Sequence, residues 1–314
     1  MRPELPGIAH EFVEANGMRF SVATAGSGDR LALCLHGFPE CWYSWHHQMS
    51  LLAELGYRVW APDLRGYGES SRPPRVQDYS IENLLADIAG LIDASGARSV
   101  TLIAHDWGGL LAWWFALRKL RPLERLVVFN APHPTVGQER ASWRQRMRSW
   151  YMLFFQLPRL PEMYMGKDAR GVVRAMEQAA GRPDAFTPEE LEIFRSSAAL
   201  PGALTAMINY YRALVRGGGY KRQLELGSPP IEVPTLLLWG TDDAAIGTEL
   251  THGMAPYVPD LTIRYVPGVG HWSQQEAPDK TNPILAAWLA DEAVPILPGD
   301  EQYREAPQEQ GIQA

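Results

Sequence analysis

Short apolar segments alternate along the chain with longer segments in which apolar residues recur every three or four positions. The short segments end at glycine, proline or a polar residue, which is typical of strands buried on both faces of a sheet. Residues 81–91 show the helical spacing, and Ser80 before them predicts an N-cap. Strands that alternate with helices predict an α/β fold with a mostly parallel sheet. The predicted strands are residues 10–14, 18–24, 31–35, 57–61, 100–104, 126–129, 235–239 and 261–266.

The alternation stops between the sixth and seventh predicted strands. Residues 135–229 are rich in arginine, methionine and aromatic residues, show helical patterns and contain no convincing buried strand. We therefore expect a core made of residues 1–134 and 230–294, with a helical cap at 135–229 inserted after the sixth strand. Residues 295–314 are rich in proline, glutamate and glutamine, so a disordered tail is expected there.

The composition is that of an ordinary globular protein and narrows the choice of partners. Of the 314 residues, 46% are hydrophobic and 21% are charged, which is enough for a large core. The formal net charge of −7 argues against nucleic-acid binding, which needs clustered lysine and arginine. One dense basic run fits the solvated face of a helix; it comprises Arg140, Arg144, Arg146 and Arg148.

Sequence features that direct a protein to a membrane or for secretion are not evident. Cys34 lies in an apolar run and Cys41 follows a loop, so a disulfide framework is not expected. The N-terminal residues lack the charged-then-apolar layout of a signal peptide. The apolar runs fall short of the roughly 18 residues that a membrane span requires. We therefore expect a cytoplasmic protein.

The strongest chemical signal lies where the strand at 100–104 meets the following helix. The sequence Ala104-His-Asp-Trp-Gly108 fits the nucleophile elbow, a sharp turn usually written G-x-S-x-G. Small residues are needed on both sides of the tip because the strand and helix backbones come close together. The tip here is Asp106, whose carboxylate is ionised near neutral pH and needs no base. Such a nucleophile suits displacement at a saturated carbon, as in an epoxide or alkyl halide, and forms an ester.

Hydrolysis of that ester needs an activated water molecule, and two later segments carry residues suited to activate it. His271 follows the strand at 261–266 within a G-x-G-H-W sequence and is the candidate base. An acidic residue that orients the histidine is expected after the strand at 235–239, where Asp242 and Asp243 are adjacent; we favour Asp243. Nucleophile, acid and histidine then follow the chain order of elbow-containing hydrolases.

The loop that begins with His36 follows a buried strand and can direct a backbone N–H into the same site. The amides of Phe38 and Trp107 are predicted to form an oxyanion hole for the tetrahedral intermediate of ester hydrolysis. His36 and His105 are expected to be structural rather than catalytic.

Several motifs together resemble the epoxide hydrolases of the α/β-hydrolase superfamily, and the resemblance runs from about residue 11 to residue 290. The motifs are H-G-F-P-E-C-W-Y-S-W at 36–45, D-L-R-G-Y-G-E-S at 63–70 and H-D-W-G-G at 105–109. The resemblance implies an α/β-hydrolase fold with Asp106 as nucleophile, Asp243 as charge-relay acid and His271 as water-activating base. Ala104 stands where many relatives have glycine, which is a mild departure because alanine is also small.

The same family uses two cap tyrosines that donate hydrogen bonds to the epoxide oxygen. Their patterns, Y-x-x-x-F-Q-x-P and N-[YWH]-Y-R, match Tyr151 and Tyr211, with Tyr211 rather than Tyr210 as the second donor. A phenol suits this role because, with a pKa near ~10, it stays protonated at neutral pH and can donate to a developing alkoxide.

The sequence therefore predicts an epoxide hydrolase that acts on a small apolar epoxide and water, without metal or organic cofactor, as a monomer or homodimer. A haloalkane or haloacetate dehalogenase stays open as an alternative. Against it, Phe38 stands where some haloalkane enzymes have asparagine, and Trp107 where haloacetate enzymes have arginine. A non-catalytic ligand sensor is a remote alternative, because a binder does not need the catalytic residues together. The aromatic and methionine-rich cap predicts a mainly apolar pocket, and the sequence does not define which of its side chains face it; they include Trp150, Phe154, Phe155, Met163 and Met165.

Overall fold

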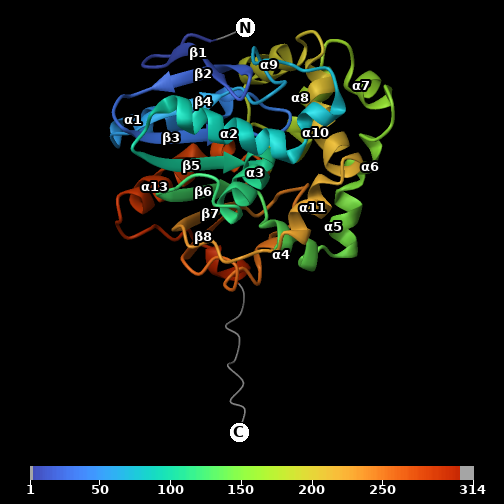
Figure 1. Cartoon of the computed structure of the whole chain (residues 1–314). Helices are drawn as coiled ribbons and strands as arrows, with labels where there is room; N and C mark the ends of the chain where they lie inside the picture. Colours follow the sequence, from blue (N-terminus) through green and yellow to red (C-terminus); the bar gives the residue numbers. More distant parts are fainter. Residues whose placement is uncertain (1–2, 305–314) are drawn as a thin grey trace.

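The computed structural model describes residues 3–304 and contains an eight-stranded sheet (Figure 1). Its strands lie in the order β1-β2-β4-β3-β5-β6-β7-β8, with β2 antiparallel to both β1 and β4 and every other pair parallel. Each predicted strand is found, with its ends within one residue of the prediction. The strands are β1 (Ala9–Ala15), β2 (Met18–Ala25), β3 (Arg30–Leu35), β4 (Arg58–Pro62), β5 (Ser99–His105), β6 (Arg125–Phe129), β7 (Thr235–Gly240) and β8 (Leu261–Val266).

Local sequence explains both the first turn of the sheet and the burial of its centre. Asn16 and Gly17 both have positive φ, 47° and 68°, and join β1 to β2 in a tight hairpin. At the centre, β3 and β5 are buried along almost their whole length, so they are apolar on both faces rather than alternating. Their carboxyl ends, at Leu35 and His105, therefore lie side by side deep in the molecule, where a site can be assembled.

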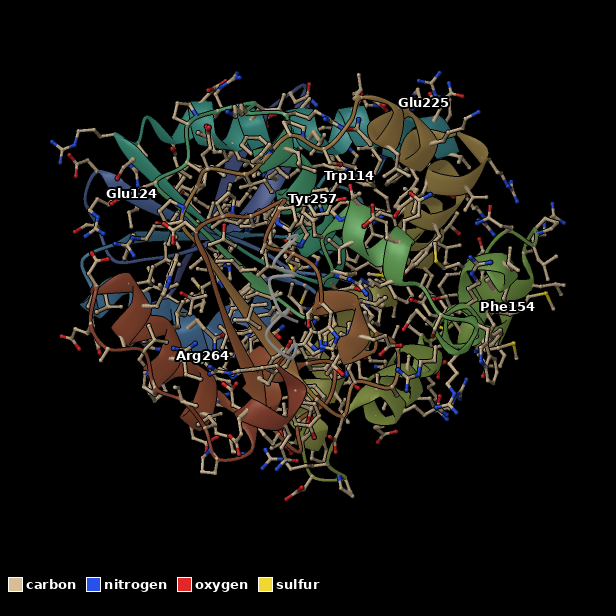
Figure 2. All side chains as sticks on the ribbon, turned by 90° about the horizontal axis from the view of Figure 1, so that it is seen from below. Trp114, Glu124, Phe154, Glu225, Tyr257 and Arg264 are labelled. Carbon is tan, nitrogen blue, oxygen red and sulfur yellow. The ribbon has the colours of Figure 1, made fainter. Side chains whose placement is uncertain are left out.

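Helices cover both faces of the sheet. On one face α2 (Ile81–Ser95) packs against α3 (Asp106–Leu117), and on the other α1 (His46–Glu54) packs against α13 (Pro278–Leu289), as the view along the sheet in Figure 2 shows. The predicted cap of α2 is confirmed, because the Ser80 side chain accepts a hydrogen bond from the backbone N–H of Asn83. The shorter elements outside the cap are η1 (Trp42–Trp45), η2 (Val76–Tyr79), η3 (Thr248–Thr251), α12 (Ser273–Glu276) and η4 (Asp300–Tyr303).

Eight helices lie between β6 and β7 and form the cap, which confirms a helical insertion after the sixth strand. They gather on one side of the sheet in Figure 1. In Figure 2 the cap residue Phe154 lies at the opposite end of the molecule from Glu124, which directly precedes β6, so the cap covers the carboxyl ends of the parallel strands. The helices are α4 (Pro134–Arg140), α5 (Trp143–Arg148), α6 (Trp150–Phe154), α7 (Leu160–Met165), α8 (Arg170–Ala179), α9 (Pro188–Ala198), α10 (Ala203–Arg216) and α11 (Gly219–Glu225). None of the helices within residues 3–304 is both long and apolar enough to cross a bilayer.

The C-terminal segment differs in part from the disorder expected for residues 295–314. Residues 295–304 are ordered and end in η4, where Asp300 is fully buried. They are held by hydrogen bonds from Arg264 Nε to the carbonyl of Pro295 (2.8 Å) and between His252 Nε2 and the carbonyl of Tyr303 (3.1 Å). Composition did not reveal these contacts, because they are made largely by backbone carbonyls. Residues 305–314 lie outside the described part of the chain.

Candidate active site

The turn from β5 into α3 places Asp106 at the centre of the molecule. Asp106 has a positive φ of 48°, in the left-handed region that aspartate adopts more readily than most residues other than glycine. Glycines make the turn possible: a Cβ on Gly108 would lie 2.3 Å from the carbonyl oxygen of Leu35, and one on Gly37 would lie 2.4 Å from the Asp106 side chain. The geometry is that of the predicted nucleophile elbow, with the aspartate carboxylate presented above the sheet.

Three residues predicted to act together lie in a chain of close contacts. His271 Nε2 lies 3.6 Å from Asp106 Oδ2, and His271 Nδ1 lies 2.7 Å from Asp243 Oδ2. Asp243 is also fixed by the backbone N–H groups of Ala245 and Ile246, each 2.8 Å from its Oδ1. Asp242 instead accepts a hydrogen bond from its neighbour Thr241 and makes no contact with the histidine. The structure therefore brings His271 between two carboxylates.

This arrangement favours an ion pair in the resting site. Burial by itself lowers the pKa of His271, but the Asp243 carboxylate, together with that of Asp106, raises it well above its ordinary value of 6.5. Burial likewise raises the pKa of Asp106, but the hydrogen bond and charge of His271 outweigh it and hold this pKa below 3.8. At neutral pH the site therefore contains an ionised Asp106, a protonated His271 and the Asp243 carboxylate.

A backbone amide also holds the Asp106 carboxylate, at the other oxygen. The N–H of Phe38 donates to Asp106 Oδ1 at 2.8 Å. Trp107 is the second residue of α3, where a backbone N–H has no acceptor within the helix. The two amides predicted as an oxyanion hole thus belong to the loop after β3 and to the first turn of α3.

The two predicted cap tyrosines lie across the cavity from the sheet. Tyr151 in α6 and Tyr211 in α10 line the same hollows as Asp106, and their rings are 5.9 Å apart, nearly perpendicular. Burial, reinforced by the negative charge of Asp106, raises the pKa of both phenols above the ordinary value of 10. Both hydroxyls therefore remain protonated over the whole neutral and mildly alkaline range. The neighbouring Tyr210 points elsewhere and donates to the carbonyl of Arg65 at 2.8 Å.

Two cavities meet at Asp106, Tyr151 and Tyr211. One has a volume of about 510 Å³ and extends towards α4 and α11, and the other, of about 370 Å³, runs beneath α6 and α8. The lining is mainly apolar, so the site fits a hydrophobic substrate. The sequence left open which apolar cap side chains face the pocket: of the five singled out, four line the smaller cavity, whereas Met163 is 73% exposed and lies outside it.

Asn130 is a site residue that the sequence did not reveal. It follows β6 with a φ of 41°, and its Nδ2 donates to Asp243 Oδ2 at 2.9 Å. Its Oδ1 accepts from the backbone N–H of Gly240 and from the hydroxyl of Ser273. Asn130 therefore positions the acid that holds His271. In the sequence Asn130 is an asparagine directly after a buried strand. Many ordinary turns have the same pattern, so it did not identify Asn130 as a site residue.

Glu40 forms a second hidden network beneath the elbow. This buried carboxylate accepts from the N–H of Gly37 at 2.7 Å and lies 2.8 Å from Nδ1 of His105, whose Nε2 is 2.9 Å from the carbonyl of His271. Glu40 and His105 therefore tie the Phe38 loop, the elbow and the His271 loop together. His36 lies between its own loop and Leu64, whose N–H donates to its Nε2 at 3.0 Å. Both histidines occupy structural positions, as expected.

Glu276 holds the loop that carries His271. Its Oε1 accepts from the N–H of Trp272 at 3.0 Å, and its Oε2 accepts from Gly270 at 3.0 Å and from Gly181 of the cap at 2.8 Å. One buried side chain thus fixes the histidine loop and connects it to the cap.

Comparison with known proteins places this arrangement in a family. A model for the alpha/beta hydrolase fold matches residues 33–163. The chain is 35% identical to the AB hydrolase superfamily protein YfhM of Bacillus subtilis, over 92% of this chain and 100% of that protein. It is 36% identical to epoxide hydrolase 4 of Mus musculus, over 92% of this chain and 81% of that protein.

The comparison of structures agrees with the comparison of sequences. The crystal structure of Bacillus megaterium epoxide hydrolase in complex with an inhibitor superposes with a TM-score of 0.81 at 27% identity, covering 89% of this chain and 100% of the other. Similarity over nearly the whole chain, at this level of identity and with the same topology, leads to one conclusion. The chain belongs to the epoxide hydrolase family of the α/β-hydrolase superfamily.

Proposed function

We propose that this enzyme hydrolyses epoxides to vicinal diols through a covalent ester on Asp106. The observation that carries the proposal is the position of this carboxylate, held between the Phe38 amide and His271 and facing a cavity that Tyr151 and Tyr211 also line. A carboxylate nucleophile in an apolar cavity with two phenol donors suits ring opening at a saturated carbon.

In the first step Asp106 attacks one epoxide carbon. A carboxylate oxygen forms the new C–O bond while the bond from that carbon to the epoxide oxygen breaks, leaving an alkoxide. Tyr151 and Tyr211 donate hydrogen bonds to this alkoxide, and the raised pKa of each phenol means that the hydroxyl proton is present throughout the working pH range. The Asp106 pKa below 3.8 keeps the nucleophile ionised.

Ester formation itself prepares the second step. Asp106 loses its negative charge on alkylation, so one of the two carboxylates that raise the pKa of His271 is removed. The pKa of the imidazole falls, and its proton can neutralise the alkoxide. Neutral His271, still held by Asp243, then takes a proton from water, and the resulting hydroxide attacks the ester carbonyl. The amides of Phe38 and Trp107 bind the oxyanion, and its collapse releases the diol and restores the carboxylate.

We propose different roles for the two parts of the chain. We assign residues 1–134 and 230–294 to the catalytic core and residues 135–229 to a substrate-binding cap that closes over an apolar epoxide. The two cysteines, Cys34 and Cys41, are both buried free thiols, which fits a reducing compartment such as the cytoplasm.

A single turnover in heavy-oxygen water tests the ester mechanism. With enzyme in excess over a simple epoxide such as styrene oxide, the first diol should carry ordinary oxygen from Asp106, while the label enters the Asp106 side chain. Label in the diol of the first turnover would exclude the ester route. The His271→Gln variant should accumulate the ester, seen by intact mass as an adduct on the peptide that contains Asp106. Asp242→Asn is the matched control, because its carboxylate does not touch the histidine.

A further inference from the structure

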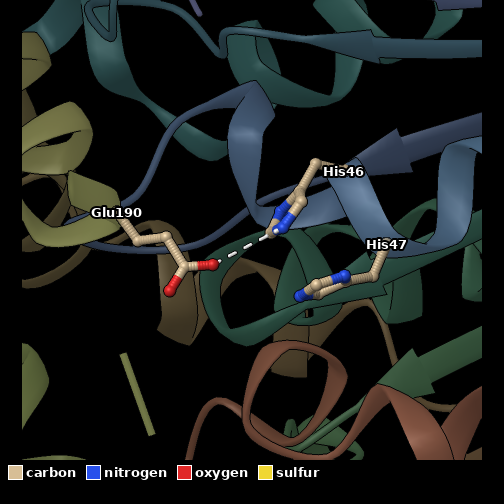
Figure 3. A group of neighbouring side chains, drawn as sticks. All are labelled: His46, His47 and Glu190. Atoms are coloured by element: carbon tan, nitrogen blue, oxygen red, sulfur yellow. Dashed lines mark ion pairs between the residues drawn. The ribbon is translucent and has the colours of Figure 1, made fainter. Parts of the chain in front are cut away.

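His46, His47 and Glu190 form a cluster between the core and the cap (Figure 3). His46 and His47 are the first two residues of α1, and Glu190 lies in the first turn of α9. Their candidate ligand atoms, one from each side chain, all lie within 4.8 Å of one another. None of the three residues lines the two cavities around Asp106, so the cluster is separate from the proposed catalytic site.

The hydrogen bonding of His46 leaves a nitrogen lone pair directed at Glu190. Nδ1 lies 2.7 Å from the carbonyl oxygen of Tyr43, so this nitrogen carries the proton and Nε2 of the neutral ring is an acceptor. Two acceptors, Nε2 and the Glu190 Oε1 atom, therefore face each other.

Glu190 is held in place by the cap of its own helix. Its Oε2 accepts hydrogen bonds from the backbone N–H of Thr187 at 2.8 Å and from the Thr187 hydroxyl at 3.0 Å, completing a capping box. The other oxygen, Oε1, is thereby directed towards His46. The side chains of His46 and Glu190 are only 11% and 20% exposed, so water screens this contact poorly.

The separation of the two acceptors fits an ion between them. His46 Nε2 and Glu190 Oε1 are 3.6 Å apart, which is longer than a charge-assisted hydrogen bond of ~2.8 Å. Two ligands of a tetrahedral zinc ion, each bound at ~2.0–2.1 Å, lie about 3.4 Å apart. The ring of His47 lies beside that of His46, with centroids 3.7 Å apart, and its candidate ligand nitrogen lies within 4.8 Å of the other two ligand atoms.

We propose that His46, His47 and Glu190 bind a divalent transition-metal ion of the zinc type, with water as a fourth ligand. Two neutral imidazoles and one carboxylate are ligands that zinc prefers, and the bond from His46 Nδ1 to the Tyr43 carbonyl is the outer contact typical of a metal-bound histidine. The ion connects α1 of the core to α9 of the cap. Its role is to fasten the cap, and it takes no part in epoxide chemistry.

Calorimetric titration of tag-free, chelator-treated protein with Zn²⁺ tests the site. The wild type should bind one equivalent, and Zn²⁺ should raise its melting temperature. His46→Asn, His47→Asn and Glu190→Gln should each weaken binding at least about 10-fold and reduce the thermal shift. Glutamine at position 190 can keep the capping box, so this variant should melt close to the wild type when metal is absent. His252→Asn removes a histidine elsewhere and should bind as the wild type does.

A spectroscopic readout identifies the ligands independently of stability. Co²⁺ in place of Zn²⁺ should give the visible absorption of a four-coordinate site in the wild type and lose it in His46→Asn. The proposal is overturned if the wild type binds no stoichiometric metal, or if the three variants bind as tightly as the wild type. It is also overturned if binding disappears in His271→Asn but persists in His46→Asn, since the metal would then occupy the catalytic site.

Discussion

The sheet side and the cap side of the active site are held by different kinds of contact. On the sheet side, Asp106, Asp243 and His271 are fixed by direct hydrogen bonds between 2.7 and 2.8 Å long. On the cap side, Tyr151 and Tyr211 are positioned mainly by contacts between aromatic rings. Hydrogen bonds are strongly directional, whereas aromatic contacts accept a range of angles. We therefore expect the sheet side to determine the reaction and the cap side to adapt to different epoxides.

The cap is nevertheless anchored beside the second tyrosine. Arg212 follows Tyr211 and donates to the carbonyls of Phe155 and Leu157 and to the carboxylate of Glu162. This buried guanidinium joins α10 to α7 and to the segment between α6 and α7. By contrast, the residues of α6 are half-buried or exposed, and its Leu153 is 74% exposed. The Tyr211 side of the cap is thus the more rigid of the two, and the Tyr151 side is the more adaptable.

The largest effect should follow from removing the nucleophile on the sheet side. Asp106→Ala eliminates the group that forms the ester, so diol formation should fall by about 10⁴-fold or more. Product analysis by chromatography with a terminal alkyl epoxide measures this loss, with Asp242→Asn as the active control. Diol formation close to the wild-type rate in Asp106→Ala would mean that another group attacks the epoxide. A short bromoalkane, assayed in parallel for halide release, distinguishes epoxide hydrolysis from dehalogenation.

Removing one phenol on the cap side should slow only the first half of the reaction. Tyr151→Phe and Tyr211→Phe should each reduce the rate of ester formation by about 10²-fold, because one donor to the alkoxide remains. Hydrolysis of the ester should change little, which rapid-quench measurement of the ester can resolve. Tyr210→Phe is the matched control, since its hydroxyl bonds to Arg65 and not to the cavity. Equal slowing of both half-reactions would contradict a role confined to ring opening.

The parts of the site that could be predicted from the sequence are those with a local signature. A small residue, an aspartate and a glycine between a strand and a helix indicated Asp106, because the tight elbow restricts which residues fit. The choice between Asp242 and Asp243 was less constrained, since either can follow the strand, and the structure places Asp243 beside His271. The central strands were predictable because strands buried on both faces are almost uniformly apolar, whereas β1 and β2 were indicated by alternating runs on either side of Asn16-Gly17.

The residues that escaped prediction act through partners distant in the chain. Asn130 bonds to Asp243, 113 positions later, and Glu40 to His105, 65 positions later. An asparagine after a strand and a glutamate in a loop have many equally suitable local roles, so only the folded arrangement identifies their partners. The outward orientation of Met163 was hidden for the same reason, because periodicity in short helices does not define which face meets the cavity.

A smaller effect should follow from removing a hydrogen bond that positions Asp243 while Asp243 itself is kept. Asn130→Ala removes the hydrogen bond to Asp243, and the lost support for His271 should slow ester hydrolysis by about 10-fold, the equivalent of one charge-assisted hydrogen bond. Ester formation should be nearly unchanged. Ser273→Ala is the control, because it removes a contact with the other end of the Asn130 amide and leaves the bond to Asp243 intact. Equal slowing by Ser273→Ala would show that general loosening, rather than the bond to the acid, is responsible.

The smallest effect should appear in stability as a function of pH, and it should come from the sheet side alone. The raised pKa of His271 contributes stability that is complete below pH 6.5 and is lost as the pH rises through the folded-state value. The lowered pKa of Asp106 contributes stability that is complete above pH 3.8 and is lost as the pH falls through its folded-state value. Both contributions are therefore complete between these limits.

Urea unfolding at several pH values measures this contribution as the difference between the wild type and His271→Gln. Above pH 6.5 the advantage of the wild type should fall with a slope of at most ~1.4 kcal/mol per pH unit, the value for one proton. Tyr211→Phe should leave this pH dependence unchanged, because the raised pKa of Tyr211 keeps its hydroxyl protonated over the same range. If Tyr211→Phe altered the pH dependence of unfolding as much as His271→Gln does, the cap side would also contribute a titrating group. That result would contradict the difference between the two sides.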